Sequence, residues 1–327
     1  MQLNDDVDFT GRTIDHYAIV ALIRAGGQGR VYRARDEVLH REVAIKVLNS
    51  GAALAAGADH ELIAEARALS SLNHPNVAGV YDFVTYDHRD FMVMELIAGA
   101  TLHDILAGGA LPWPEVVRLG AQLARGLAAA HAVKIAHCDV KPANLTLSPA
   151  GLLKIVDFGL ATRLSPDVLV NDGRTTAAGI AGTLPYMAPE VLRGERPDER
   201  SDIFSAGTVL YEMATGMRAF PQTTLTGLVH AIDAGAVVPP SHLNPAVSAA
   251  LDRVILRALM TAPSSRYPAA IHLAEALERL QPRARIRSRR RRTRTTRLVA
   301  GSMGAARDVT SVPAPPVLAQ SRPAAAP

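Results

Sequence analysis

The stretch of sequence that decides the fold reads His137-Cys138-Asp139-Val140-Lys141-Pro142-Ala143-Asn144, and Asp157-Phe158-Gly159 follows it. Between the two motifs, residues 152–156 have a β-strand pattern that leads into the second acid. Two carboxylates, an amine and a carboxamide therefore lie within a short span. Such groups can orient an attacking hydroxyl, hold Mg²⁺ and meet a transferring phosphate. Their order and separation predict a site for phosphoryl transfer.

These motifs resemble those of the eukaryotic-like protein kinase family, and more narrowly of the bacterial serine/threonine kinases. The resemblance implies an α+β fold with two lobes. A small, mainly antiparallel β lobe with one key helix runs to about residue 97, and a larger, mainly helical lobe follows. ATP is expected between the lobes. The implied domains are a flexible lead over 1–16, a kinase domain over 17–280, and a basic, then Ala/Pro-rich, disordered tail over 281–327.

The resemblance assigns roles within the central stretch. Asp139 is expected to be the catalytic base, and Lys141 is typical of Ser/Thr rather than Tyr kinases. Asn144 and Asp157 are expected to bind Mg²⁺, which prefers oxygen ligands. His137 is expected to pack against the phenylalanine of the Asp157 motif, and not to act as an acid or base.

Cys138 departs from the family pattern, because many kinases have an arginine there that waits for an activation-loop phosphate. Cysteine cannot play that part. Either loop phosphorylation is not needed, or Arg163 or Arg174 supplies the charge. We interpret Cys138 as a small buried apolar residue, although a redox role is a second reading.

A strand pattern begins at Tyr17 and runs into a glycine-rich turn, and a second strand pattern follows the turn. By resemblance, Gly26, Gly29 and Val31 would contact the nucleotide, since glycine lets backbone N–H groups approach phosphate. An ordinary hairpin is the alternative for this stretch alone. Arg24 stands where the family has its first glycine, and we expect it to change loop mobility or nucleotide affinity.

The apolar run 43–47 predicts a strand in which Ala44 and Lys46 share one face. Ala44 would lie over the adenine and Lys46 would reach the α and β phosphates. A lysine in an apolar strand needs a partner, and the resemblance names Glu65 in the following helical pattern. Surface positions for Lys46 and Glu65 are the alternative.

A third strand pattern, 91–95, leads into a hinge at 96–99. By resemblance, the Glu95 carbonyl and the Ile97 amide would bind the adenine, and Met94 would be the gatekeeper. Thr146 departs from the apolar residue that usually supports the adenine from below, so nucleotide affinity is expected to be reduced.

Residues 157–190 resemble an activation segment that ends in Ala188-Pro189-Glu190, with Thr183 in its substrate-facing part. Thr175 and Thr176 are candidate autophosphorylation sites, although hydroxyls in a polar loop are as often merely solvated. This segment favours a polypeptide acceptor over a small molecule.

Two further residues are expected to be structural. The resemblance implies that Asp202, near a helix start, braces the catalytic-loop backbone, and that Arg266 pairs with Glu190. Long helices are predicted over 114–131, from 201 onward, and over 271–280, from their apolar spacing.

Composition sets outer limits. The 327 residues are 48% hydrophobic and contain no apolar run of eighteen, so no membrane span is predicted, and the single cysteine fits a reducing, cytoplasmic compartment. The whole chain has a formal net charge of +4. Nine arginines lie between residues 283 and 297, so the remaining residues carry a net charge of −5. We read that segment as a solvated tail, with a weak polyanion contact second.

The resulting hypothesis is an ATP- and Mg²⁺-dependent bacterial kinase that phosphorylates Ser/Thr hydroxyls of proteins, with autophosphorylation. A pseudokinase scaffold is the first alternative, supported by Arg24, Cys138 and Thr146. A small-molecule kinase is the second. The sequence does not indicate an oligomeric state.

Overall fold

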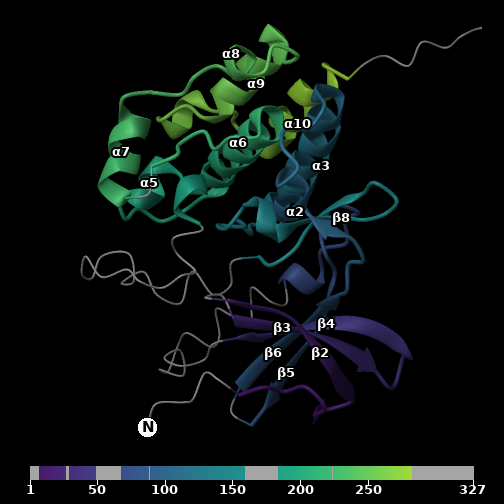
Figure 1. The fold of residues 1–327 in the computed structure, drawn as a ribbon. Helices are drawn as coiled ribbons and strands as arrows, with labels where there is room; N and C mark the ends of the chain where they lie inside the picture. Colours follow the sequence, from purple (N-terminus) through teal and green to yellow (C-terminus); the bar gives the residue numbers. More distant parts are fainter. Residues whose placement is uncertain are drawn as a thin grey trace, which may run out of the picture. The chain divides into compact units, whose positions relative to one another are not determined.

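The computed structural model describes residues 7–26, 29–48, 68–87, 89–158, 183–222 and 224–281. All of them fall in one compact unit, Met1–Arg283 (Figure 1). The unit contains an N-terminal antiparallel sheet and, after it in the chain, a region built mainly of helices.

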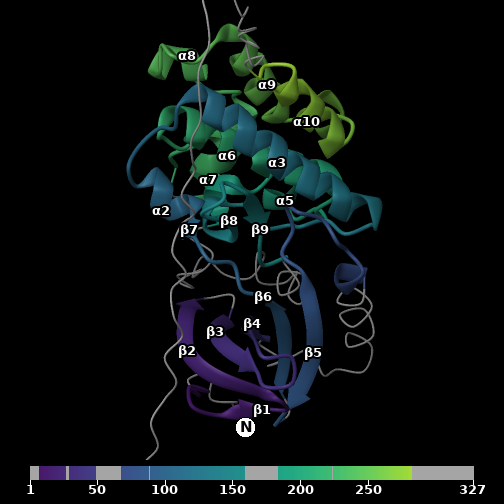
Figure 2. The same cartoon turned by 90° about the vertical axis from the view of Figure 1, so that its right-hand side faces the viewer.

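The N-terminal sheet has six strands in the order β1-β2-β3-β4-β6-β5, and each neighbouring pair is antiparallel (Figure 2). The strands are β1 (Thr13–Ile14), β2 (Tyr17–Gly26), β3 (Gly29–Asp36), β4 (Arg41–Leu48), β5 (Val80–Tyr86) and β6 (Arg89–Glu95). The predicted strands at 17–22, 43–47 and 91–95 are confirmed.

The central strand β4 separates two apolar clusters, as its alternation predicted. Val43, Ile45 and Val47 belong to a cluster confined to the N-terminal sheet. Ala44 belongs instead to the large core that continues into the helical region. Because side chains alternate across a strand, Lys46 shares the face of Ala44 and is directed toward the junction of the two regions.

The helical region is organised around α3 (Trp113–Ala132), which extends the predicted helix by one residue at each end. Its elements pack through a shared core of leucine, isoleucine, valine and alanine side chains. The other helices are α2 (Leu102–Leu106), α5 (Pro189–Leu192), α6 (Glu199–Thr215), α7 (Leu225–Asp233), α8 (Pro240–Leu243), α9 (Ala249–Ala258) and α10 (Ala270–Glu278). Single 3₁₀ turns occur at η1 (Pro142–Asn144), η4 (Leu184–Tyr186) and η5 (Pro263–Ser265).

A glycine in α3 permits the closest approach between helix and strand. A Cβ on Gly126 would lie 2.7 Å from Ile155 Cδ1 and 2.9 Å from the Asn76 carbonyl oxygen. Real Cβ atoms are essentially never so close to other atoms, so the packing requires glycine at this position.

A second, three-stranded sheet carries the central motifs. Its strands are, in order, β7 (Ala100–Thr101), β8 (Leu145–Leu147) and β9 (Leu153–Ile155). The strand predicted at 152–156 is β9, which is shorter by one residue at each end. The β9 residue Ile155 forms a parallel bridge with Val77, and the Asn76 side-chain amide donates to the Leu153 carbonyl at 2.8 Å. These contacts fix the end of β9, from which Asp157 follows.

None of the helices within the described ranges is long and apolar enough to cross a membrane.

Candidate active site

The loop between α3 and β8 places Asp139 and Asn144 against each other. The Asn144 side-chain amide donates to the Asp139 backbone carbonyl at 3.0 Å and to Asp139 Oδ2 at 2.5 Å. Both residues are buried. The amide nitrogen is thereby used, and Asn144 Oδ1 is left buried with no hydrogen-bond partner among the residues that the structure describes. A buried acceptor of this kind is costly unless something binds it.

Asp202 of α6 holds the backbone of this loop. Its carboxylate accepts from the backbone amide of His137 at 2.7 Å and from that of Cys138 at 2.8 Å, and it lies 2.8 Å from His131 Nε2. Cys138 has a φ of 63°, a left-handed conformation that is unusual for a residue with a side chain. The predicted bracing role is confirmed, and it explains how the loop keeps a strained residue beside Asp139. Asp202 lies four residues into α6, which begins earlier than expected, with Asp198 as its N-cap.

His137 is fully buried and packs on Phe158, with ring centroids 4.6 Å apart. Burial lowers the pKa of His137, although Asp202 and Asp139 oppose that shift. A neutral, buried ring of this kind supports the loop, which confirms the predicted structural role.

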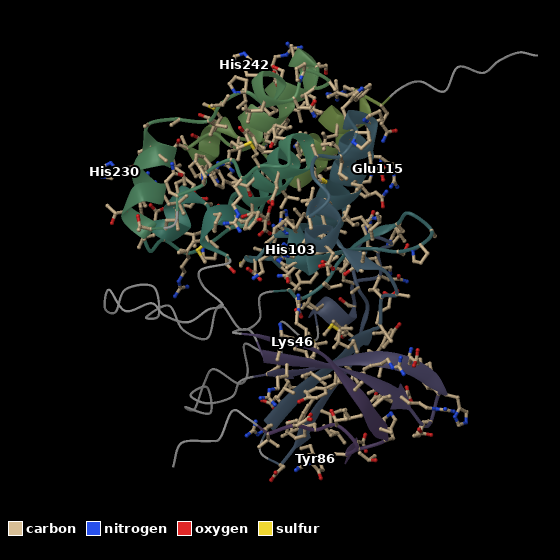
Figure 3. All side chains as sticks on the ribbon, in the orientation of Figure 1. Lys46, Tyr86, His103, Glu115, His230 and His242 are labelled. Carbon is tan, nitrogen blue, oxygen red and sulfur yellow. The ribbon has the colours of Figure 1, made fainter. Side chains whose placement is uncertain are left out.

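Asp157 receives two cations from the N-terminal sheet. Lys46 Nζ lies 3.0 Å from Asp157 Oδ1, and Arg24 Nη2 lies 2.5 Å from Asp157 Oδ2. Burial alone would raise the pKa of Asp157, but the charges of Lys46 and Arg24 outweigh it and hold that pKa below its ordinary value. Figure 3 labels Lys46 on β4, and this ion pair joins that strand to the segment after β9.

Lys141 connects Asp139 to the start of the next described segment. Its ammonium group lies 2.9 Å from Asp139 Oδ2 and donates to Thr183 Oγ1 at 2.8 Å. The side chain of Lys141 is only 12% exposed, so its contact with the acid is little screened by water. Asp139, Lys141 and Thr183 thus form a contiguous group, a contact that was not predicted from the sequence.

Beside this group is a small, partly open hollow with room for little more than a water molecule. Its lining includes Asp139, Thr183, Met187, Ala188 and Val191. Ser201, Asp202 and Ser205 also line it, so the hollow has a mixed polar and apolar wall that includes the acid.

The predicted pair between Glu190 and Arg266 is confirmed. Arg266 donates from both Nη atoms to the two Glu190 oxygens, each at 2.7 Å, and its side chain is fully buried. Burial would raise the pKa of Glu190, but the hydrogen bonds from Arg266 and Ser201 hold it below its ordinary value. This pair ties α5 to η5.

Four of the residues expected to contact the nucleotide, Gly26, Gly29, Val31 and Ala44, lie on the consecutive strands β2, β3 and β4. Gly26 pairs with Gly29, whose φ of 106° is the left-handed conformation that favours glycine. Val31 is partly buried and packs on the large core, of which Ala44 is a member. Lys46 follows on the same face as Ala44.

The expected hinge follows β6. The backbone of Glu95 ends the strand, while its side chain accepts from Lys154 at 2.6 Å. Ile97 lies beyond the strand, where the backbone is not in a ladder. Met94 and Thr146 are both buried. No contact in the structure assigns these residues to a ligand, so their roles remain proposals.

Several predicted residues lie outside the described ranges: Glu65, Thr175, Thr176, Arg163 and Arg174. The contact between Arg24 and Asp157 was not predicted from the sequence, in which Arg24 was interpreted only as a replacement for the first glycine. A cation in a glycine-rich turn that is expected to bind phosphate is visible in the sequence, but only the folded chain shows that the Arg24 side chain reaches Asp157.

The oxygens of this site fit a divalent cation. Asn144 Oδ1 is buried without a hydrogen-bond partner in the described part of the chain, and Asp157 provides a carboxylate on the adjacent loop. Carboxylate and amide oxygens are hard ligands of the kind that Mg²⁺ prefers. The Arg24 guanidinium, which also donates to the Ala143 carbonyl at 3.1 Å, shows that this position accepts positive charge.

Comparisons with known proteins agree with this geometry. The family model described as "Protein kinase domain" matches residues 17–286. PknB of Mycobacterium leprae, a serine/threonine-protein kinase, is 34% identical over 271 residues, which cover 81% of this chain and 43% of PknB. The serine/threonine-protein kinase pkn3 of Myxococcus xanthus is 35% identical over 282 residues, which cover 81% of this chain and 50% of pkn3.

The fold has solved counterparts. The crystal structure of the PknI kinase domain of Mycobacterium tuberculosis matches with a TM-score of 0.62 and 23% identity, covering 82% of this chain and 98% of that domain. The chain spans at most half the length of the two curated relatives named above. The N-terminal sheet and the helical region are therefore the two lobes of the kinase fold, and the chain belongs to the protein kinase family.

Proposed function

We propose that the chain is an ATP-dependent protein kinase that transfers the γ-phosphoryl group to Ser or Thr hydroxyls of protein substrates. The observation that carries this proposal is the convergence of four groups from separate segments. Lys46 comes from β4, Asp139 and Asn144 from the loop after α3, and Asp157 from the segment after β9. Family membership and the names of the relatives support the same activity.

In the proposed reaction, Asp139 accepts or orients the proton of the attacking hydroxyl. The Asn144 amide and the Lys141 ammonium both contact Asp139 Oδ2, so the direction of the carboxylate is fixed before the acceptor arrives. Positioning of this kind supplies much of the catalysis of phosphoryl transfer. Lys141 would also lie close to the transferred phosphate and offset its charge.

Asn144 and Asp157 would hold Mg²⁺ through their side-chain oxygens. The bound ion would supply neutralisation of the charge on the phosphate oxygens. Lys46 would bind the α and β phosphates, with Glu65 as its proposed partner, and Gly26, Gly29 and Val31 would cover the nucleotide. Ala44 and the backbone of Glu95 and Ile97 would contact the adenine.

The acceptor is proposed to be a polypeptide. Met187, Ala188 and Val191 lie in the wall of the hollow beside Asp139, where they would flank an acceptor segment that passes over the acid. Thr183, bound to Lys141, lies between that hollow and the acid. The curated relatives are serine/threonine-protein kinases, which supports a polypeptide acceptor over a small molecule.

The proposal is tested by incorporation of labelled phosphate from ATP into a generic protein substrate with Mg²⁺ present. Lys46→Met and Asp139→Asn should each reduce the signal by at least about a hundredfold, as removal of a base or a charge-stabilising group does. Phosphoamino-acid analysis should yield phosphoserine and phosphothreonine. Equal incorporation by the parent chain and both variants would refute the assignment.

A nucleotide-independent scaffold is the second candidate, and the pair between Arg24 and Asp157 is the observation that favours it. The pair covers a metal-binding carboxylate with a protein cation. The same assay separates the two functions, because a scaffold would show no incorporation that depends on Asp139.

Other predictions from the sequence stay proposals. Thr175 and Thr176 are proposed autophosphorylation sites, testable by phosphopeptide mapping against Asp139→Asn. The arginine-rich segment 283–297 is proposed to make at most a weak polyanion contact. A cytoplasmic location is proposed from the single cysteine, which suits a reducing compartment.

A further inference from the structure

The contacts of Arg24 go beyond the change in loop mobility or nucleotide affinity that the sequence predicted for it. It lies on β2, immediately after an irregularity in the β2–β3 register between Leu22 and Arg24. Bulges of this kind redirect the side chains that follow them. The guanidinium reaches the catalytic region, where it donates to the Ala143 carbonyl at 3.1 Å and to Asp157 Oδ2 at 2.5 Å.

This cation lies beside both proposed magnesium ligands. One of its contacts, Ala143, is the immediate neighbour of Asn144, and the other is Asp157 itself. Lys46 Nζ lies 3.0 Å from Asp157 Oδ1. Cations from the N-terminal sheet therefore stand beside both carboxylate oxygens, and a metal ion that binds either oxygen meets the repulsion of a neighbouring positive charge unless that cation withdraws.

The burial of the two cations decides which one withdraws. The Lys46 side chain is 3% exposed, so moving its ammonium group away from Asp157 would separate charges in a poorly solvated interior. The Arg24 side chain is 39% exposed and can transfer its charge into water at small cost. Arg24 is thus the exchangeable cation.

We propose that Arg24 competes with Mg²⁺ for the Asp157 carboxylate and so sets the magnesium concentration at which the site takes up nucleotide. This inference rests on the proposed function, since it needs a nucleotide and metal site at Asp157. Arg24 is a specificity-determining residue for the metal and not a member of the catalytic group. Its replacement should shift the Mg²⁺ concentration at which nucleotide binding is half-maximal.

The test measures uptake of a fluorescent ATP analogue by the full chain while free Mg²⁺ is varied. Arg24→Gln removes the charge and keeps a polar side chain. Its magnesium midpoint should be roughly three- to tenfold lower than that of the parent chain, as expected for an ion pair between the exposed and buried limits. Arg33→Gln is the matched control, since Arg33 is 48% exposed on β3 and pairs with Glu42. Its midpoint should not change.

A second arm uses Mn²⁺ alone, followed by electron paramagnetic resonance without nucleotide. Arg24→Gln and Arg24→Gly should both bind Mn²⁺ more tightly than the parent chain, and Arg24→Lys should stay close to it. Glycine is the residue that the family has at this position, so that variant should keep the fold even if glutamine does not.

Each outcome decides the matter. Equal midpoints in Arg24→Gln and the parent chain, or a higher midpoint in the variant, would overturn the inference while the proposed function stands. A parent chain that takes up no nucleotide at any Mg²⁺ concentration would overturn the proposed function. The Mn²⁺ arm would then still decide whether Arg24 competes for Asp157, because equal Mn²⁺ binding in all variants overturns it.

Discussion

Replacement of Arg266 by methionine should destabilise the kinase domain by about 3–5 kcal/mol. The Arg266 guanidinium makes two hydrogen bonds of 2.7 Å to Glu190 and others to the carbonyls of Met260, Arg200 and Thr261. Its side chain is fully buried and that of Glu190 is 8% exposed. Methionine fills similar space but removes both Arg266 hydrogen bonds from a buried carboxylate, which keeps only the bond from Ser201 and a backbone hydrogen bond.

The loss should be visible as a lower melting temperature. For a domain of this size, 1 kcal/mol corresponds to a shift of roughly 2–3 °C, so a drop of about 6–15 °C is expected. Differential scanning fluorimetry measures the shift, and urea unfolding gives the free energy of unfolding. Arg193→Met is the matched control, because Arg193 pairs with Asp233 on the surface, and it should cost less than about 1 kcal/mol.

The double variant Arg266→Met/Glu190→Leu distinguishes a stranded charge from lost packing. It buries no unpaired carboxylate, so at least about 2 kcal/mol of the loss should return. If the single variant costs less than about 1 kcal/mol, or if the two single effects simply add in the double variant, the reasoning about the buried pair is wrong.

Further predictions concern the same domain. Gly126→Ala should lower stability by about 1–3 kcal/mol, because its Cβ would meet the Asn76 carbonyl at 2.9 Å, whereas Gly79→Ala, with contacts of 3.5 Å or more, should be nearly neutral in the same melting assay. The stability that Glu190 provides should be constant above about pH 5 and should decline as the pH falls below 4.5, the ordinary pKa of a glutamate, because the folded-state pKa of Glu190 is lowered. The difference in unfolding free energy between the parent chain and Glu190→Gln should therefore shrink over that range. A difference that grows on acidification would contradict this prediction. Asp202→Ala should reduce kcat by at least about tenfold with little change in KM for ATP, since it releases the backbone amides of His137 and Cys138; an unchanged kcat in steady-state assays would count against the bracing role.

Much of the site could be predicted because its residues lie in short motifs. The order of Asp139, Lys141, Asn144 and Asp157 is a local property of the chain, and the alternation around Lys46 gives its face in β4. The structure confirms the expected contacts of His137 with Phe158 and of Asp202 with the loop. The helix ends were less predictable, since α6 begins at Glu199 under a cap that Asp198 provides.

The amino-acid sequence by itself determined the family, the two-lobed architecture and the identity of the groups at the site, because these depend on motif order and on periodicity. Only the tertiary structure decided which cation meets which oxygen. Arg24 and Asp157 are 133 positions apart, and no local pattern relates them. Their contact depends on a strand irregularity, on the register of the N-terminal sheet and on the end of β9, and such distances are settled only when the whole domain packs.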